Sequence, residues 1–270
     1  MTSDRADRFL SLHKAGQPLL MPNAWDRGSA VLFESLGFQA LATTSSGFAA
    51  TLARLDGMVT RDQAIAHGAE LAEAAGVPVS ADLENCFADE PADVAETVRL
   101  AIDAGLAGCS IEDYSGLEGD NIYDAGFAAE RVTAAAEAAH SDDRRLVLTA
   151  RAENHVHGRD DLSDTIARLQ SYQEAGADVL FAPGLRKIEQ IREVVASVDL
   201  PVNVLAVPGT PPVSELAAAG VSRISVGGAF AFAAFGAAAT AARELMDSGT
   251  YDYLKSAAIG SKAAHDAFAH

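Results

Sequence analysis

The sequence predicts an α/β fold, a TIM-like (β/α)8 barrel, on three observations. Eight short apolar segments recur along the 270 residues, and several are continuously apolar, as in strands that are covered on both faces. Segments rich in helix formers, with apolar residues three and four positions apart, lie between them. Eight such strand-helix units in about 250 residues match the size of a TIM barrel.

The predicted strands follow one another at intervals that leave room for helices between them. They are residues 18–22, 40–44, 77–82, 107–111, 146–150, 177–181, 201–206 and 222–226. An Ala-Gly pair precedes four of them, ending at Gly76, Gly105, Gly176 and Gly220, and a glycine directly after a helix is typical of a left-handed C-cap. The alternative, an open doubly wound sheet, should carry a Gly-rich phosphate-binding turn after its first strand. Residues 23–28, Asn-Ala-Trp-Asp-Arg-Gly, are not that turn.

Three further helices are predicted outside the repeating units. Residues 3–15 form a leading helix, and residues 228–247 and 251–269 form two closing helices. No linker, low-complexity segment or charge run divides the chain, so we expect one domain over residues 1–270. The last helix carries small apolar residues on one face and needs a partner surface, within the chain or on another subunit.

The composition argues against several classes of partner. The formal net charge of −18 disfavours nucleic acid and anionic membranes, which require basic patches, but not a small acidic substrate.

The N-terminus has no apolar core, so it is not a signal peptide. Two cysteines, Cys86 and Cys109, suit free, inert thiols in a reduced compartment, and we expect a cytoplasmic protein. The Ala-rich stretch from Gly228 to Leu245 contains charged residues and predicts a buried helix rather than a membrane span.

Charged residues stand at the ends of three consecutive predicted strands. Asp82 and Glu84 end the third, Glu112 follows the fourth and Arg151 the fifth. Strand alternation would turn Asp82 and Glu84 to the same face. If the strands are parallel neighbours, the acids converge and repel one another, which calls for a hard divalent cation such as Mg²⁺. For any one acid, a helix N-cap is the alternative.

Other candidate site residues follow neighbouring strands. Ser45-Ser46-Gly47-Phe48 follows the second strand, and its small residues let backbone N–H groups approach an anionic oxygen. The alternative is an ordinary strand-to-helix turn with a Ser cap. His155, His157 and Tyr114 are candidate proton donors or acceptors, although such a histidine is more often structural or solvated.

An ordered set of motifs carries a resemblance to a known family. The motifs are Pro22-Asn-Ala-Trp-Asp26, Thr43-Thr-Ser-Ser-Gly47, Asp82-x-Glu84, Ile111-Glu-Asp113, Ala150-Arg151, Glu174-Ala-Gly-Ala-Asp178 and Pro201-Val-Asn203. Over roughly residues 8 to 245 the chain resembles the isocitrate lyase/phosphoenolpyruvate mutase superfamily. The resemblance implies a TIM-like barrel, often with a C-terminal helix swapped between subunits. It also implies Mg²⁺ (or Mn²⁺) and an α-oxo acid or its enolate.

The resemblance assigns roles to individual residues. Asp82 resembles the direct metal ligand, and three further acids resemble those that hold the metal mostly through water: Asp56, Glu84 and Glu112. Three residues fall where donors hold the carboxylate of the oxo acid: Ser46, Gly47 and Phe48. Arg151 matches the arginine on the substrate, and Asn203 falls near a carboxylate-binding asparagine. The catalytic candidates are then Arg151, Asp56, Glu112 and His155.

The chain departs from the lyase pattern in the segment from Tyr114 to Tyr123. Lyases of the superfamily carry a cysteine there and the mutase a lysine, but this segment has neither. We expect it to act as a mobile lid, without isocitrate or 2-methylisocitrate lyase activity. The expected function is Mg²⁺-dependent cleavage of a C–C bond in a small α-oxo acid, as in oxaloacetate decarboxylation, by a homo-oligomer built as a dimer of dimers. The alternatives are phosphonomutase or phosphonopyruvate hydrolase chemistry at a P–C bond, and a non-catalytic α-oxo acid binder.

Overall fold

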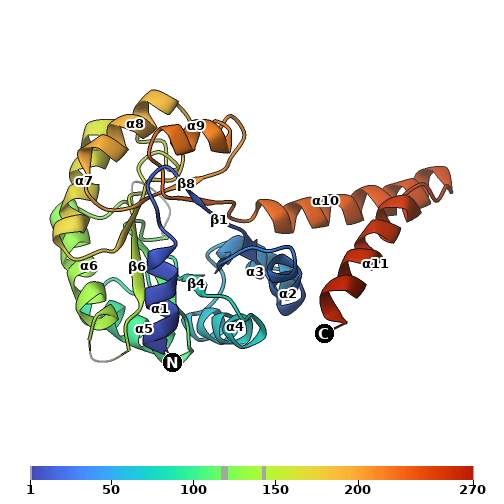
Figure 1. Cartoon of the computed structure of the whole chain (residues 1–270), viewed down its shortest axis with the longest axis horizontal. Helices are drawn as coiled ribbons and strands as arrows, with labels where there is room; N and C mark the ends of the chain where they lie inside the picture. Colours follow the sequence, from blue (N-terminus) through green and yellow to red (C-terminus); the bar gives the residue numbers. More distant parts are fainter. Residues whose placement is uncertain (1, 117–120, 142–143, 270) are drawn as a thin grey trace.

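A parallel β-barrel surrounded by helices forms the body of the molecule (Figure 1). The computed structural model describes residues 2–116, 121–141 and 144–269 of the chain. Within these ranges nine strands form one parallel sheet, in the order β1-β9-β8-β7-β6-β5-β4-β3-β2. The sheet is nearly closed, so the predicted TIM-like α/β fold is confirmed.

Every predicted strand segment contains a strand. The bounds are β1 Leu19–Met21, β2 Asn23–Ala24, β3 Leu41–Thr43, β4 Val79–Asp82, β5 Gly108–Glu112, β6 Val147–Arg151, β7 Val179–Phe181, β8 Val202–Leu205 and β9 Arg223–Ser225. The first predicted strand contains β1, and Pro22 separates β1 from a further short strand, β2, that was not predicted. β1 pairs with β9, and β2 pairs with β3. Asn23 joins the two sides of this seam, because its Nδ2 donates to the Thr43 carbonyl at 2.6 Å and its Oδ1 accepts from the Gly227 N–H at 2.9 Å.

The predicted helices are also present. They are α1 Thr2–Ser11, α2 Arg27–Ser35, α3 Ser45–Thr51, α4 Arg61–Ala74, α5 Pro91–Asp103, α6 Ala125–Ala139, α7 Leu162–Glu174, α8 Ile188–Ser197, α9 Val213–Ala218, α10 Ala229–Arg243, a π-helical turn η1 Glu244–Ser248 and α11 Leu254–Phe268. Three of the four Ala-Gly pairs end in a left-handed glycine, as predicted: Gly105, Gly176 and Gly220. The prediction was wrong for Gly76. Helix α4 ends at Ala74, Ala75 has an extended backbone, and the Gly76 N–H donates to Glu34 Oε2 at 2.9 Å.

The N-terminal end of the barrel is closed by α1. Phe9 is fully buried in an apolar cluster with residues from the starts of several strands, including Leu19, Val147 and Val179. Gly108 allows this contact, since a Cβ at that position would lie only 2.8 Å from the Phe9 ring. Because α1 closes this end, the opposite end of the barrel, where the strands end, is the one that can hold an active site.

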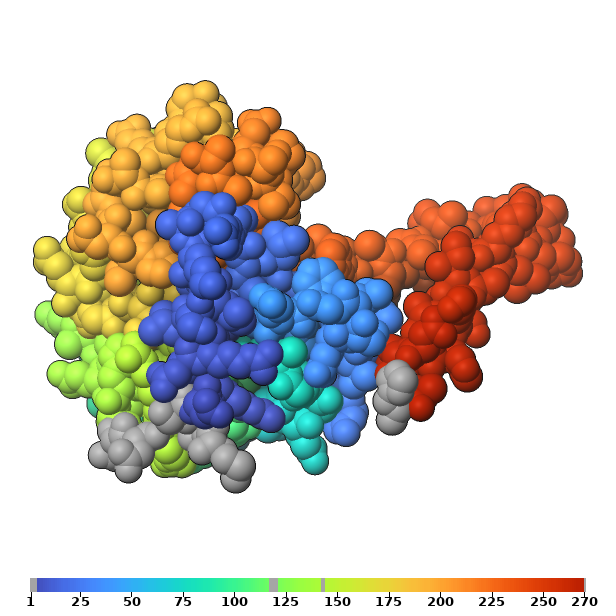
Figure 2. Space-filling view, viewed as in Figure 1, coloured from blue at the N-terminus to red at the C-terminus, as the bar shows by residue number. Residues whose placement is uncertain are grey.

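The two closing helices form an arm. In Figures 1 and 2, α10 leaves the barrel and α11 turns back toward α2, and α2 and α11 are in contact. The expectation of a buried helix over this stretch was wrong for the single chain, since of α10 only Ala231 is buried. The cause is the direction of α10, which projects away from the core. In the described ranges, every helix is too short or too polar to cross a membrane.

Candidate active site

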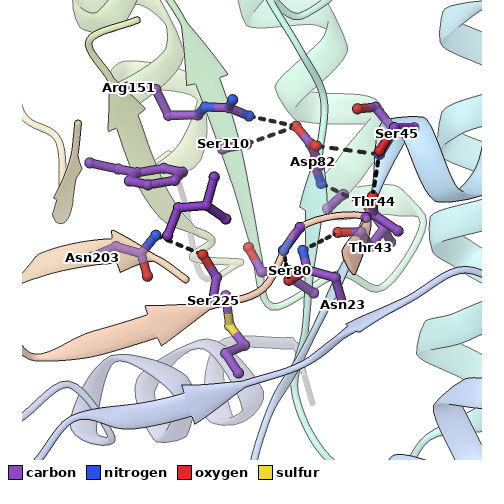
Figure 3. A pocket seen from close by; sticks show the side chains of 18 of the residues that line it. Asn23, Thr43, Thr44, Ser45, Ser80, Asp82, Ser110, Arg151, Asn203 and Ser225 are labelled. Atoms are coloured by element: carbon purple, nitrogen blue, oxygen red, sulfur yellow. Dashed lines mark hydrogen bonds and ion pairs between the residues drawn. The ribbon is translucent and has the colours of Figure 1, made fainter. Parts of the chain in front are cut away.

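Two adjoining cavities lie at the C-terminal ends of the strands. The inner cavity, of about 210 Å³, is lined by residues of nearly every strand, and the outer cavity, of about 410 Å³, is lined by the loops above. Both are lined by Ser45, Asp56, Arg151 and Leu205. Figure 3 shows residues that line the inner cavity, with the side chains of Arg151 and Asp82 in direct contact. The predicted convergence of the strand ends is therefore present.

Arg151, the last residue of β6, is at the centre of this site. Its Nη1 lies 2.9 Å from Asp82 Oδ1, its Nη2 3.1 Å from Glu112 Oε2, and its Nε 2.8 Å from Glu153 Oε1. The side chain of Arg151 is only 16% exposed. Three carboxylates therefore share one largely buried guanidinium, an arrangement in which each hydrogen bond is charge-assisted.

Asp82 is held from four sides. Its Oδ1 accepts from Arg151 and from the Ser110 hydroxyl at 3.4 Å, and its Oδ2 accepts from the Ser45 N–H at 3.3 Å. Its own N–H donates to the Thr43 hydroxyl at 2.8 Å. Each partner comes from a different element, β5, β6, β3 or the start of α3. The orientation of this carboxylate is thus set by the barrel rather than by local sequence.

Glu84 reaches the site in a way that strand alternation did not predict. β4 ends at Asp82, and Glu84 has a left-handed backbone with φ of 51°. Cys86 and Phe87 are also left-handed, with φ of 61° and 56°. The same-face argument was therefore wrong, because the chain turns out of the strand. Glu84 lines the outer cavity, whereas Asp82 lines the inner one.

Arg131 of α6 holds the loop from 85 to 89 that follows β4. The side chain is 1% exposed and donates to four backbone carbonyls, those of Asn85 at 2.6 Å, Ala88 at 2.8 Å, Asp89 at 3.0 Å and Glu112 at 3.1 Å. Left-handed conformations of ordinary residues cost roughly 1–2 kcal/mol each. Arg131 therefore stabilises an otherwise unfavourable backbone beside Glu84 and Glu112.

The outer cavity carries an excess of negative charge. Four acids and one arginine line it: Asp56, Glu84, Glu112, Glu153 and Arg151. Burial, with a contribution from Asp82, raises the pKa of Glu84 to about 7. Burial also raises the pKa of Glu112 well above its usual range, although Arg151 opposes this. A divalent cation would relieve this repulsion with oxygen ligands, so the residues present fit such a group.

No protein cage for a metal is preformed in the part of the chain that the structure describes. Within these residues, no three His, Cys, Asp or Glu side chains are grouped closely enough to ligate one ion. This is compatible with a cation that is bound directly by one carboxylate and otherwise through water, the pattern expected of Mg²⁺.

The three residues predicted to bind the substrate carboxylate lie in the first turn of α3, which directs them to different surroundings. Ser46 lines the inner cavity, and its hydroxyl is 3.3 Å from that of Thr44. Gly47 is buried below, where its N–H donates to the Thr44 hydroxyl and a Cβ would lie 3.1 Å from Ala231. The Phe48 N–H donates within the helix and its ring stacks on His67 at 3.8 Å between centroids. The structure places only Ser46 of these three at the cavity.

Asn203 and Arg223 lie at the floor of the inner cavity. Asn203 is 1% exposed, donates to Ser225 Oγ at 3.0 Å and accepts from Arg223 Nε at 2.9 Å. Arg223 also contacts Thr149 and His13, and burial lowers its pKa to about 9. Sequence reasoning missed Arg131 and Arg223, although a cation inside a predicted apolar strand was a visible signal for Arg223.

The two histidines after β6 have opposite positions. His155 is packed against α7, with Nε2 3.2 Å from Thr165 Oγ1 and Nδ1 3.2 Å from Asp160, and it lines neither cavity. His157 lines the outer cavity and stacks on Tyr114 with 3.6 Å between centroids. The prediction favoured His155, but the geometry brings His157 to the site.

Asp113 and the cysteines do not line either cavity. Asp113 is 2% exposed and accepts from Tyr172 at 2.6 Å and from Arg168 at 3.1 Å. Cys86 and Cys109 are free and buried, and burial raises the pKa of the Cys86 thiol to about 12. In the predicted lid, Tyr114 pairs with Ile122 in an antiparallel bridge, while residues 117–120 lie outside the described residues.

Residues 9–246 match the family model described as phosphoenolpyruvate phosphomutase. The chain belongs to this family. The resemblance to the isocitrate lyase/phosphoenolpyruvate mutase superfamily is thereby confirmed. Members of this superfamily are C–C lyases and phosphonomutases, and the chain is an enzyme of this kind.

Three relatives illustrate the range of the family. A Burkholderia cenocepacia J2315 protein described as a lyase or mutase is 47% identical, with a TM-score of 0.91 over 94% of this chain and 92% of that one. An uncharacterised Mycobacterium tuberculosis protein is 34% identical over 88% of this chain and 89% of its own length. Oxaloacetate acetylhydrolase in complex with its product oxalate is 25% identical, with a TM-score of 0.83 over 92% and 89% of the two chains.

Proposed function

We propose that this enzyme cleaves a C–C bond next to the carbonyl of a small α-oxo acid, through an enolate and with Mg²⁺ or Mn²⁺ as cofactor. The observation that carries the proposal is the position of Arg151, which lines both cavities between Asp82 and Glu112. A guanidinium there can pair with a substrate carboxylate, while the acids beside it favour a cation. The inner cavity, at about 210 Å³, suits a small substrate.

We assign the roles of the residues from the family resemblance and from their positions around the two cavities. Asp82 would hold the cation directly, with Asp56, Glu84 and Glu112 around it through water. The cation supplies positive charge beside the oxygen on which the enolate charge develops. Arg151 orients the substrate carboxylate, and the donors at the start of α3 that face the cavity, including the Ser46 hydroxyl, bind its other oxygens.

The reaction is proposed to be a decarboxylation or hydrolysis rather than an isocitrate-type cleavage. The described residues that line the cavities include no cysteine, and the 114–123 segment has none in its sequence. Decarboxylation of an oxaloacetate-like acid needs little beyond charge stabilisation of the enolate. The likeness to oxaloacetate acetylhydrolase, whose product is oxalate, supports a substrate of this class.

Chemistry at a P–C bond is the second candidate function. The matching family model is that of phosphoenolpyruvate phosphomutase, and the same acids and Arg151 would serve a phosphonopyruvate substrate. The absence of the mutase lysine from residues 114–123 favours C–C cleavage. A binder without turnover would not require so many acids around one arginine.

The arm supports a proposal of assembly. Large apolar side chains on α10 and α11 are exposed in the single chain, among them Phe232 at 51%, Phe235 at 47% and Ile259 at 73%. Exposed apolar surface of this extent marks an interface. We propose a homo-oligomer, a dimer of dimers, in which a second copy of this chain covers the arm. The free thiols suit a reduced, cytoplasmic location.

Turnover of a panel of α-oxo acids tests the function. Oxaloacetate, phosphonopyruvate and isocitrate are each incubated with the full-length enzyme, with Mg²⁺ and with a chelator. We expect Mg²⁺-dependent loss of oxaloacetate and no glyoxylate from isocitrate. Formation of phosphoenolpyruvate or phosphate from phosphonopyruvate, without turnover of the other acids, would establish the second candidate instead. Tight oxalate binding without turnover of any acid would identify a binder.

A further inference from the structure

Enolate chemistry requires a group that moves a proton at the carbon next to the carbonyl. Three ionisable side chains of the outer cavity are unsuited to this, because Arg151 remains a cation and Glu112 and Glu153 are paired with it. His157 is the one histidine that lines the outer cavity within the described residues. An imidazole can both accept and donate a proton near neutral pH.

The position of His157 is fixed by a tight turn after β6. Its N–H donates to the Glu153 carbonyl at 3.3 Å, so that both side chains lie on the same side of the turn. The buried Asn154 anchors the turn to α7 by donating to Asp164 at 2.6 Å. The imidazole Nε2 lies 3.8 Å from Glu153 Oε2, and its ring stacks on Tyr114 with an interplanar angle of 15°.

The Glu153 carboxylate and the His157 imidazole thus lie side by side at the outer cavity, and a neighbouring acid is the group that enzymes use to orient a base. Glu153 is 4% exposed and is itself held by Arg151, whereas His157 is 33% exposed and faces solvent as well as the cavity. Partial burial lowers the pKa of His157, although the charge of Asp113 acts to raise it. A lowered pKa favours the neutral imidazole, which is the form that accepts a proton.

We propose that His157 carries protons to and from the substrate carbon next to the carbonyl, with Glu153 as its positioning residue; this rests on the proposed function. In the enolising direction, the C–H bond breaks, its electron pair forms the enolate, and the proton moves to an imidazole nitrogen. In the reverse direction, the imidazolium returns a proton to that carbon, and the π electrons of the C=C bond form the new C–H bond. Exchange of the imidazolium proton with solvent water completes the cycle.

Deuterium exchange into pyruvate tests this step without any need for the natural substrate. Proton NMR follows loss of the methyl signal of pyruvate in D2O with full-length enzyme and Mg²⁺, and calorimetry measures oxalate affinity in parallel. We expect His157→Ala to slow exchange about 100-fold or more, the usual contribution of an acid–base group, while oxalate affinity stays within threefold. Added imidazole should restore part of the exchange to His157→Ala, which a purely structural role would not allow.

The outcomes separate this inference from the proposed function. A wild type that binds no oxalate overturns both. A wild type that binds oxalate without exchanging pyruvate, or a His157→Ala enzyme that exchanges at the wild-type rate, overturns only the role of His157. Loss of exchange in His155→Gln with His157→Ala unaffected would transfer the role to His155.

Discussion

Arg151 and Asp82 are 69 positions apart in the chain, yet Nη1 of the arginine lies 2.9 Å from Oδ1 of the aspartate. The carboxylate proposed to bind the cation is therefore also a partner of the proposed substrate-binding guanidinium. Binding of a cation at Asp82 and the contacts of Arg151 are thereby coupled through one side chain.

Removal of the Asp82 carboxylate should abolish binding of the cation. We expect Asp82→Ala to show no measurable Mg²⁺ or Mn²⁺ binding by calorimetry, while circular dichroism shows the wild-type fold. Glu112 and Glu153 still pair with Arg151 in that variant, so the guanidinium keeps partners. Asp82→Asn is the matched control for side-chain volume and should behave in the same way. Unchanged Mg²⁺ affinity in either variant would refute the assignment.

Replacement of Arg151 by lysine should be poorly tolerated although the charge is kept. The three nitrogens of Arg151 contact three different carboxylates, and a single ammonium cannot reproduce this planar fork. A lysine ammonium also cannot make the paired contact that Arg151 is proposed to make with the carboxylate of oxalate. A loss of about 3 kcal/mol of charge-assisted hydrogen bonding to oxalate is roughly 100-fold in oxalate affinity. Titration of oxalate in the presence of Mg²⁺ gives the comparison. An Arg151→Lys affinity within threefold of wild type would contradict a paired carboxylate contact.

Loss of the Arg131 guanidinium should destabilise the fold and loosen the loop after β4. Four backbone carbonyls would lose a donor in Arg131→Met, and unsatisfied buried groups cost about 1–3 kcal/mol each before relaxation. We expect the free energy of unfolding to fall by roughly 3–5 kcal/mol, measured by urea unfolding. Hydrogen exchange should increase in residues 84–89. Arg131→Lys should recover part of the stability, and uniform exchange across the barrel would argue against a local role.

Acid should destabilise the protein through His67. This side chain is 5% exposed, its Nε2 is 3.1 Å from the Trp25 carbonyl, and burial lowers its pKa to about 4. Because the unfolded histidine binds a proton near pH 6.5 and the folded one does not until about pH 4, stability is full above 6.5 and is lost as the pH falls through this window. In His67→Gln, the acid-induced fall in the free energy of unfolding should be smaller by roughly 2–3 kcal/mol. Urea unfolding of both proteins at pH 7 and pH 4.5 measures the difference, and parallel losses would exclude His67 as the cause.

Truncation of the arm should dissociate the assembly. Removal of residues 249–270 deletes α11, on which Leu254 is 55% exposed and Phe268 54% exposed in the single chain. Each of these side chains contributes about 25 cal/mol per Å² of buried apolar surface when a partner covers it. Light scattering should show a tetramer for the full-length chain and smaller species for the truncated one. A monomer at full length would show that α11 packs only on its own α2.

The sequence by itself determined the barrel and most of the residues that meet at its open end. Continuous apolar runs identify buried parallel strands, because both faces of such a strand are covered by helices or by the barrel interior. Charged residues that end consecutive runs must then meet, as Asp82, Glu112 and Arg151 do. Family membership follows from the same ordered set of motifs.

Only the tertiary structure decided how individual side chains are used. The left-handed backbone at Glu84 and the support that Arg131 gives it depend on hydrogen bonds across 42 to 46 positions of the chain, which no local pattern encodes. The tight turn that directs His157 to the cavity and His155 to α7 likewise depends on packing against another helix. Periodicity reports which face of an element is buried, whereas the aim of a polar side chain depends on neighbours that are distant in sequence.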